Sequence, residues 1–223
     1  MTSTPKRPPT AQEFVLEQLR VAIASRELIP GVQIRQDALA EKYGTSRVPL
    51  REALKILEGE GQVTYVPHRG YFVTELSLED LLEVYRIREI LEKEAIAQAV
   101  ANLTEEDLEL IEAALQETES ASLAGDISAM TAANRKFHFL IFELSNMPRL
   151  TRLIRVLWDA TDAYRAVYYS SANNRDRVDH EHREILLALK ARDEIAAINL
   201  LDQHRNHAVE QLREVLADVS HQD

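Results

Sequence analysis

The sequence predicts a mainly α-helical protein, in which a small part of three helices and a β-hairpin precedes an antiparallel bundle of six helices. Two observations predict this division. Five of the six glycines and six of the seven prolines lie at or before Gly70, so turns are frequent early and rare later. Formal charge divides at nearly the same place: residues 1–74 contain 10 Lys and Arg against 8 Asp and Glu (+2), and residues 75–223 contain 16 against 29 (−13). We therefore expect the two parts to have different partners.

The first part carries the signals of short helices and a hairpin. Residues 1–9, with three prolines, are expected to form a disordered tail before a folded domain at 10–75. Apolar spacing, the Gly44-Thr45 turn and Ser46 as an N-cap predict three helices, and two β-rich runs predict a hairpin. The predicted elements are helices at 10–27, 36–43 and 48–60 and strands at 62–66 and 70–74. This order is typical of a winged helix-turn-helix domain.

The second part, residues 76–223, repeats helix-start signals. An N-cap residue or a first-turn proline precedes each apolar-periodic run: Ser77, Thr104, Asp126, Pro148, Asn174 or Asp176, and Asp193. The predicted helices end near residues 101, 124, 146, 169, 192 and 220. Six helices with short connections indicate an antiparallel bundle.

Composition excludes several classes of protein. Cysteine is absent, which rules out disulfides, thiolate catalysis, Cys-ligated zinc and iron–sulfur clusters. No run of 18 apolar residues is present, and residues 1–9 lack the apolar segment of a signal peptide. We therefore expect a cytoplasmic protein without a membrane partner.

The densest motif, residues 46–54, begins the third predicted helix. Arg47 and Arg51 are four residues apart and share one face, opposite the leucines that seek the core. A helix N-terminus attracts phosphate, and the arginine fork matches phosphate or the O6 and N7 atoms of guanine. An ordinary solvated face is the alternative for any single arginine, but the whole arrangement favours DNA. The predicted DNA-binding residues are Arg35, Thr45, Ser46, Arg47, Arg51, His68, Arg69 and Gly70.

Residues 10–75 resemble a known family. The similarity rests on Leu39-Ala40, the 46–54 motif, Leu57-Glu58, Gly61 and Arg69-Gly70-Tyr-Phe-Val73. These residues resemble the DNA-binding domain of the GntR family of bacterial transcriptional regulators. The resemblance implies binding to double-stranded operator DNA, and hence association with the nucleoid. Asp37 stands where the family often has a DNA-contacting arginine.

Three histidines lie on apolar faces of different predicted helices. They are His138, with Asn134 one turn earlier on the same face, His182 and His204. A single histidine in such a place is usually a satisfied core residue. Three converging imidazoles with one oxygen donor would instead suit a divalent metal.

The bundle also resembles a known domain. Phe137-His138, residues 146–150 and the interval from His182 to His204 resemble the FCD ligand-binding domain of the FadR branch of GntR regulators, and six helices resemble its VanR-type subgroup. In that domain an Asp and three His hold a divalent metal. The resemblance therefore implies a zinc-, nickel- or manganese-type ion at Asn134, His138, His182 and His204, with Asn134 as a neutral, weaker ligand.

Arg88 is a charged residue on an inward helical face, beside Tyr85. Glu92, one turn later, could simply neutralise it. The alternative is a clamp for the carboxylate of a small organic acid that the metal also binds. The resemblance supports the clamp, because effectors of the family are commonly metabolite acids. Further candidates for this effector site are Arg152, Tyr164 and Arg165.

These observations predict a homodimeric transcriptional regulator, expected to be a repressor, whose operator binding responds to a small carboxylate effector. Paired half-sites on DNA mirror a twofold protein, which is the reason to expect a dimer. One alternative is a metal-dependent enzyme, because an open metal site activates water. Against this alternative, no clear general base lies one helical turn from a ligand, and Glu181 is expected to point away from His182. The other alternative is a metal sensor without an organic effector.

Overall fold

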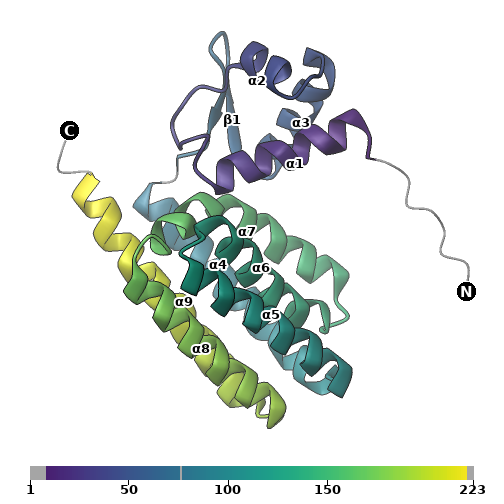
Figure 1. The fold of residues 1–223 in the computed structure, drawn as a ribbon, viewed down its shortest axis with the longest axis vertical. Coiled ribbons are helices and arrows are strands. Elements are labelled where there is room, and N and C mark those ends of the chain that lie inside the picture. Colours follow the sequence, from purple (N-terminus) through teal and green to yellow (C-terminus); the bar gives the residue numbers. More distant parts are fainter. Residues whose placement is uncertain (1–8, 76, 220–223) are drawn as a thin grey trace, which may run out of the picture. The chain divides into compact units, whose positions relative to one another are not determined.

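The chain divides into two compact units, Met1–Glu75 and Leu76–Asp223. The computed structural model describes residues 9–75 and 77–219 of them (Figure 1). The expected tail at 1–9 lies outside the described residues except for Pro9. Within the described ranges the fold is mainly helical, with nine helices and one two-stranded sheet, as the sequence predicts.

The first unit is a winged helix-turn-helix. Its elements are α1 (Ala11–Ala24), α2 (Gln36–Lys42), α3 (Arg47–Gly59), β1 (Val63–Val66) and β2 (Gly70–Val73). A capping box between Thr10 and Glu13 starts α1. Helix α3 packs on both α1 and α2, and the core between them consists of fully buried aliphatic side chains: Val15, Leu19, Leu50, Ala53, Leu54 and Leu57.

The turn between α2 and α3 depends on Gly44. Its φ of 62° lies in the left-handed region, which a residue without a Cβ adopts at no steric cost. The backbone N–H of Thr45 then donates to the carbonyl of Ala40 (2.9 Å), which closes the turn. Ser46 occupies the N-cap position of α3, but its side chain makes no capping hydrogen bond, contrary to the sequence prediction. The hydroxyl of Ser46 is thus not committed to the helix.

Strands β1 and β2 form an antiparallel hairpin. The register runs from Val63 opposite Val73 to Val66 opposite Gly70. His68 lies in the connecting turn with a φ of 63°, and Gly70 has a φ of 91°. The hairpin therefore presents the segment from His68 to Gly70 at its tip.

The second unit is a bundle of six helices that lie side by side (Figure 1). They are α4 (Leu78–Asn102), α5 (Glu105–Ala124), α6 (Ile127–Glu143), α7 (Pro148–Tyr168), α8 (Ala172–Lys190) and α9 (Glu194–Val219). Capping boxes at Ser77 and Thr104 start α4 and α5, as expected. The prediction for α8 was wrong, because its N-cap is Ser171 rather than Asn174 or Asp176. Asn174 is buried instead, and its side-chain amide donates to the carbonyl of Tyr168 (2.9 Å).

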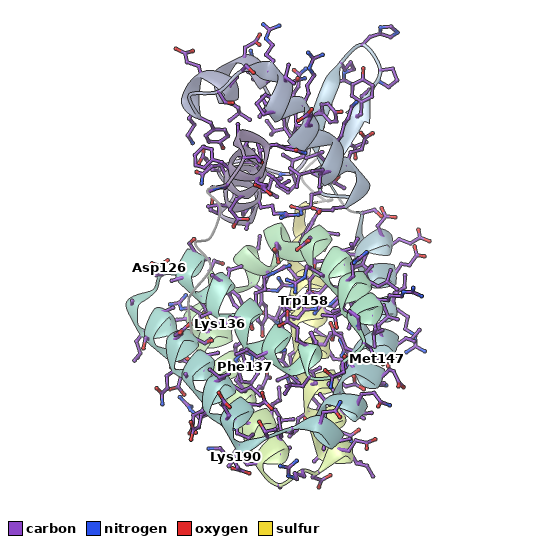
Figure 2. All side chains as sticks on the ribbon, turned by 90° about the vertical axis from the view of Figure 1, so that its right-hand side faces the viewer. Asp126, Lys136, Phe137, Met147, Trp158 and Lys190 are labelled. Atoms are coloured by element: carbon purple, nitrogen blue, oxygen red, sulfur yellow. The ribbon has the colours of Figure 1, made fainter. Side chains whose placement is uncertain are left out.

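The core of the bundle is aliphatic and aromatic. Phe137 and Phe142 on α6 are fully buried, and Trp158 on α7 is 2% exposed. Figure 2 places Phe137 and Trp158 within the body of the bundle and Lys190 at one end of it. None of the helices in the described ranges combines the length and apolar character needed to cross a bilayer. The buried titratable groups of the second unit lie inside this helical core.

Candidate nucleic-acid interface and metal centre

An open cleft of about 900 Å³ lies between α2, α3 and the hairpin in the first unit. Its charged lining residues are five cations and two anions: Arg35, Arg47, Arg51, Lys55 and Arg69, with Asp37 and Glu58. Five minus two gives a net charge of +3, in a unit whose sequence up to residue 74 carries only +2. The positive charge of this unit is therefore gathered on the cleft, where it would attract a polyanion.

Two of the cleft arginines have recorded partners. The Nε atom of Arg47 forms an ion pair with Oδ1 of Asp37, and these side chains are 65% and 71% exposed. The guanidinium of Arg69 lies 5.0 Å from the ring centroid of Phe72. Gln33 donates to the carbonyl of Arg69, which ties the hairpin tip to the segment before α2. The hairpin arginine is thus positioned by contacts on both its side chain and its backbone.

The structure brings most of the predicted DNA-binding residues to this cleft. Arg35, Arg47, Arg51, Arg69 and Gly70 line it, whereas Thr45, Ser46 and His68 lie next to it in the α2–α3 turn and at the hairpin tip. Lys55 and Tyr65 are among the lining residues that the sequence analysis did not assign to DNA binding. Lys55 was detectable, because it follows Arg51 by one helical turn.

The three predicted histidines converge in the second unit. His138 on α6, His182 on α8 and His204 on α9 each offer a nitrogen within 4.8 Å of the others, and the Nε2 atoms of His138 and His182 are 3.1 Å apart. His138 and His182 are buried, and burial holds the pKa of each well below the usual 6.5. Both imidazoles are therefore neutral, which is the protonation state that binds a metal.

Asn134 completes the group. It lies one turn before His138 and is 1% exposed, and its Oδ1 atom has no hydrogen-bond partner among the described residues. An unpaired buried acceptor is rare in proteins because it loses its hydration without compensation. Three imidazoles and one amide oxygen fit a divalent ion of intermediate softness. The residues present therefore fit the metal that the sequence implied.

Glu181 holds the third histidine in place. The Nδ1 atoms of His204 and His207 donate to its two oxygens, at 2.7 and 2.5 Å. Burial would raise the pKa of Glu181, but the hydrogen bonds from His204 and His207 lower it below its usual value. The ionised carboxylate fixes the tautomer of His204 that leaves Nε2 for a metal. Sequence analysis gave Glu181 no such role, because a contact between α8 and α9 has no local signal.

A small cavity of about 20 Å³ adjoins Asn134 and His204. Its lining consists of Tyr85, Arg88, Asn134, Trp158, Arg165, Tyr168, Tyr169, His204, Arg205 and Ala208. The guanidiniums of Arg88 and Arg165 lie 4.4 and 4.1 Å from the ring centroid of Trp158, within range of a cation–π interaction. Cationic and aromatic groups thus share one buried space, which suits an anionic ligand.

Arg88 is only partly neutralised. Its Nε donates to Glu92 (2.9 Å), so the ion pair foreseen as one alternative is present. Glu92 also accepts from Arg205 and from the indole of Trp158, so its charge is shared between two arginines. The Nη1 atom of Arg88 is buried and has no partner among the described residues. One charged donor therefore remains available in the cavity.

The other predicted effector residues divide into two groups. Arg165 lines the cavity. Arg152 is exposed and borders a separate hollow on the surface, and Tyr164 is buried on α7 but not among the cavity residues. Sequence analysis did not assign six of the lining residues to this site: Tyr85, Trp158, Tyr168, Tyr169, Arg205 and Ala208. Burial raises the pKa of Tyr168 to about 12.

Comparison with known proteins places these sites in context. Residues 11–73 match the gntR family of bacterial regulatory proteins, and residues 83–207 match the FCD domain. The uncharacterized HTH-type transcriptional regulator YdhC of Bacillus subtilis is 32% identical over 202 residues, which are 90% of each chain. The HTH-type transcriptional regulator McbR of Escherichia coli is 33% identical over 181 residues, 80% of this chain and 82% of McbR.

Solved structures agree with the sequence matches. The E. coli McbR/YncC structure has a TM-score of 0.85 at 29% identity and covers 93% of this chain and 99% of its own. A putative GntR transcriptional regulator from Rhodococcus sp. RHA1 has a TM-score of 0.78 at 25% identity, covering 91% and 97%. These relatives are transcriptional regulators rather than enzymes. The chain therefore belongs to the GntR family and is a transcriptional regulator with an FCD domain.

Proposed function

We propose that this regulator is a homodimeric repressor whose operator affinity is set by a small organic acid bound beside a divalent metal in the FCD domain. The observation that carries the proposal is the meeting of two features in one buried cavity. One is the donor set of Asn134 and three histidines, of which Asn134 and His204 line the cavity, and the other is the unpaired Nη1 of Arg88. The six helices α4–α9 also support the VanR-type subgroup.

Operator binding is assigned to the cleft between α2, α3 and the hairpin. Its excess of cations supplies the phosphate attraction that all DNA binding needs, and the arginines of α3 supply donors for base edges. Replacing Arg47 and Arg51 by alanine should cost about 1–3 kcal/mol each, in gel shifts with DNA from the neighbourhood of the gene. Arg183→Ala, an exposed arginine on α8, is the control that should bind normally. Full, salt-sensitive affinity in the double variant would refute the assignment.

The dimer follows from the demands of operator recognition. One winged domain makes few base contacts, and twofold operators mirror twofold proteins. The part of the chain after residue 74, with a formal charge of −13, would be repelled by DNA, so only the winged domains would approach the duplex. Sedimentation of the free protein and of its DNA complex should give two chains. A single chain in both would contradict the dimer.

The metal is assigned to His138, His182 and His204 with Asn134. When bound, it would supply a Lewis-acidic positive centre that carboxylate oxygens bind. Elemental analysis of the purified protein should detect a divalent metal in the wild type and a reduced amount in His182→Ala. His180→Ala is a matched control, because His180 lies on the same helix two residues earlier and is 68% exposed. Equal metal content in all three proteins would remove the site.

The effector is assigned to the space between the histidines and Arg88. None of the four candidate donors is a carboxylate, so no ligand would itself carry a charge opposite to that of a divalent ion, and a carboxylate of the effector would balance both the ion and Arg88. Calorimetric titration with a panel of metabolite acids should show binding that Arg88→Ala weakens and Arg86→Ala, an exposed control on α4, leaves unchanged. The acid should shift operator affinity by about 5–150-fold. A shift with metal alone and none with any acid would favour a pure metal sensor instead.

A further inference from the structure

Asp37 is an acidic side chain in a cleft that is otherwise basic. It lies in the first turn of α2 and lines the cleft together with Arg35, Arg47, Arg51 and Arg69. A carboxylate there repels the phosphates of DNA and lowers the favourable charge of the surface. Its presence is thus unfavourable for general attraction to DNA. The presence of Asp37 in the cleft therefore needs an explanation other than general attraction to DNA.

Protein stability does not account for it. The partner of Asp37 is Arg47, at the start of α3, and both side chains are well over half exposed. An ion pair in such an exposed place contributes little to the free energy of unfolding, because both charges are solvated. The same two helices are already joined by the buried core and by the Gly44 turn. The contact is therefore better explained by what it does to Arg47.

The contact determines which part of Arg47 remains available. Asp37 Oδ1 binds the Nε atom, and the structure records no other polar partner for Arg47 among the described residues. The two terminal nitrogens of the guanidinium, Nη1 and Nη2, are left as a pair of donors. Guanine offers two acceptors, O6 and N7, at the spacing of such a fork. An arginine without this restraint would reach phosphate oxygens as readily as base edges.

We propose that Asp37 is a specificity-determining residue, which holds Arg47 through Nε so that its fork reads a guanine rather than a phosphate. The inference rests on the proposed binding of DNA by this cleft and names what one pair of residues does there. The carboxylate acts twice. It removes rotamers of Arg47 that would be lost on binding, and it repels a phosphate from the place next to Arg47. Asp37 thus exchanges general affinity for discrimination between bases.

The inference predicts opposite effects on two measurable quantities. In Asp37→Ala, non-specific DNA affinity should stay equal or rise, because a negative charge has left the cleft. Base preference should fall at the same base pair that Arg47→Ala affects. A bidentate arginine–guanine contact gives about 5–150-fold discrimination, so the loss in Asp37→Ala should be about 5-fold or more. A residue with only a structural role would move both quantities in the same direction.

The experiment is a selection of binding sites from random duplex DNA with the full-length protein. Wild type, Arg47→Ala, Asp37→Ala and Glu41→Ala are compared, and circular dichroism confirms that each folds. Glu41 is the matched control, because it is an exposed acid on α2 that does not line the cleft. Affinities for the enriched site and for a shuffled duplex are then measured for each protein. The expected result is a motif that is weakened at one shared base pair in the first two variants and unchanged in Glu41→Ala.

Three results would overturn the inference. In the first, Asp37→Ala selects the complete wild-type motif. In the second, Asp37→Ala loses preference at a base pair that Arg47→Ala retains. In the third, Glu41→Ala loses the same preference as Asp37→Ala. The second result would mean that Asp37 contacts a base itself. Arg51→Ala and Arg69→Ala test the proposed interface itself. If the wild type enriches no motif, or if these two variants bind DNA as the wild type does, the proposed interface is wrong, and the inference about Asp37 is wrong with it. These patterns distinguish the two failures.

Discussion

Glu92→Gln should destabilise the helical bundle more than any comparable change on its surface. Glu92 is 1% exposed and accepts four hydrogen bonds. The donors are Nε of Arg88 (2.9 Å), Nε1 of Trp158 (2.7 Å), and Nε and Nη2 of Arg205 (3.0 and 2.8 Å). These bonds join α4 to α7 and α9. Glu92 therefore connects three of the six helices through a single carboxylate.

The expected loss of stability in Glu92→Gln follows from the loss of the negative charge. Glutamine has the shape of glutamate but carries no charge, and its amide nitrogen would face donors from Trp158 or Arg205. Two buried arginines would lose their shared anion, and removing one partner of a buried ion pair typically costs about 3–5 kcal/mol. Glu89→Gln is the control, on the same helix one turn earlier. Its carboxylate pairs with Arg86 and Lys93 at the surface, so the cost should be about 1 kcal/mol or less.

Urea unfolding followed by tryptophan fluorescence measures this cost directly. Trp158 is the single tryptophan of the chain, and it donates to Glu92. Its emission therefore reports unfolding of the bundle rather than of the winged domain. A loss below about 1 kcal/mol in Glu92→Gln, or a loss equal to that of Glu89→Gln, would refute the view that the carboxylate links the helices.

The same variant has a predictable pH dependence. Burial alone would raise the pKa of Glu92, but Arg88 and Arg205 together lower it below its usual value. A group with a depressed pKa in the folded state stabilises the protein above its unfolded pKa, about 4.3, and this stabilisation is lost as pH falls through the folded value. The gap between wild type and Glu92→Gln should be complete at pH 7 and shrink below about pH 4. A gap that grows on acidification would contradict the sign.

Two further predictions concern other parts of the fold. Glu181→Gln should lower metal affinity about 10–100-fold in a chelator competition, because His204 loses its orienting carboxylate. Glu184→Gln, on the exposed face of α8, is the control and should leave metal affinity unchanged. Equal metal affinity in both variants would remove the role of Glu181. Gly44→Ala should destabilise the winged domain by about 1–2 kcal/mol in denaturant unfolding, because the φ of Gly44 is 62°. Gly59→Ala, within α3, is the control and should be neutral or stabilising. The reverse order of stabilities would show that the α2–α3 turn tolerates a side chain.

Local signals in the sequence were sufficient for most of the fold. Ser77 and Thr104 start helices because a hydroxyl and an acid three residues later satisfy the first backbone N–H groups, and this pattern is visible without any tertiary knowledge. Periodicity likewise showed that His138 and His182 face inward. The start of α8 was misplaced because Asn174, a good N-cap type, binds the carbonyl of Tyr168 instead. A tertiary contact overrode the local preference.

The cavity was the part that periodicity could not define. Helical spacing states that a side chain points inward, but not which helix it meets. Arg88 was expected to face inward and Arg165 was a candidate for the effector site, and both line the cavity, yet Trp158, whose ring contacts both guanidiniums, had no distinguishing signal. Arg152 lies on the same helix as Trp158 but is exposed. The orienting contact of Glu181 with His204 joins residues 23 positions apart and arises only from the packing of α8 on α9.

The position of the candidate effector site explains how a small ligand would influence the whole bundle. The candidate metal donors come from α6, α8 and α9, and the cationic and aromatic lining of the cavity comes from α4, α7 and α9. The cavity holds about 20 Å³, room for about one water molecule, so an organic acid would have to displace side chains on several helices to enter. A ligand shifts an equilibrium only by its difference in affinity for the two states. An acid that binds an expanded bundle and not the compact one would therefore couple its own binding to the arrangement of five helices. Allosteric coupling of this kind is typically about 1–3 kcal/mol, and one charge-assisted hydrogen bond to Arg88 is sufficient to supply it.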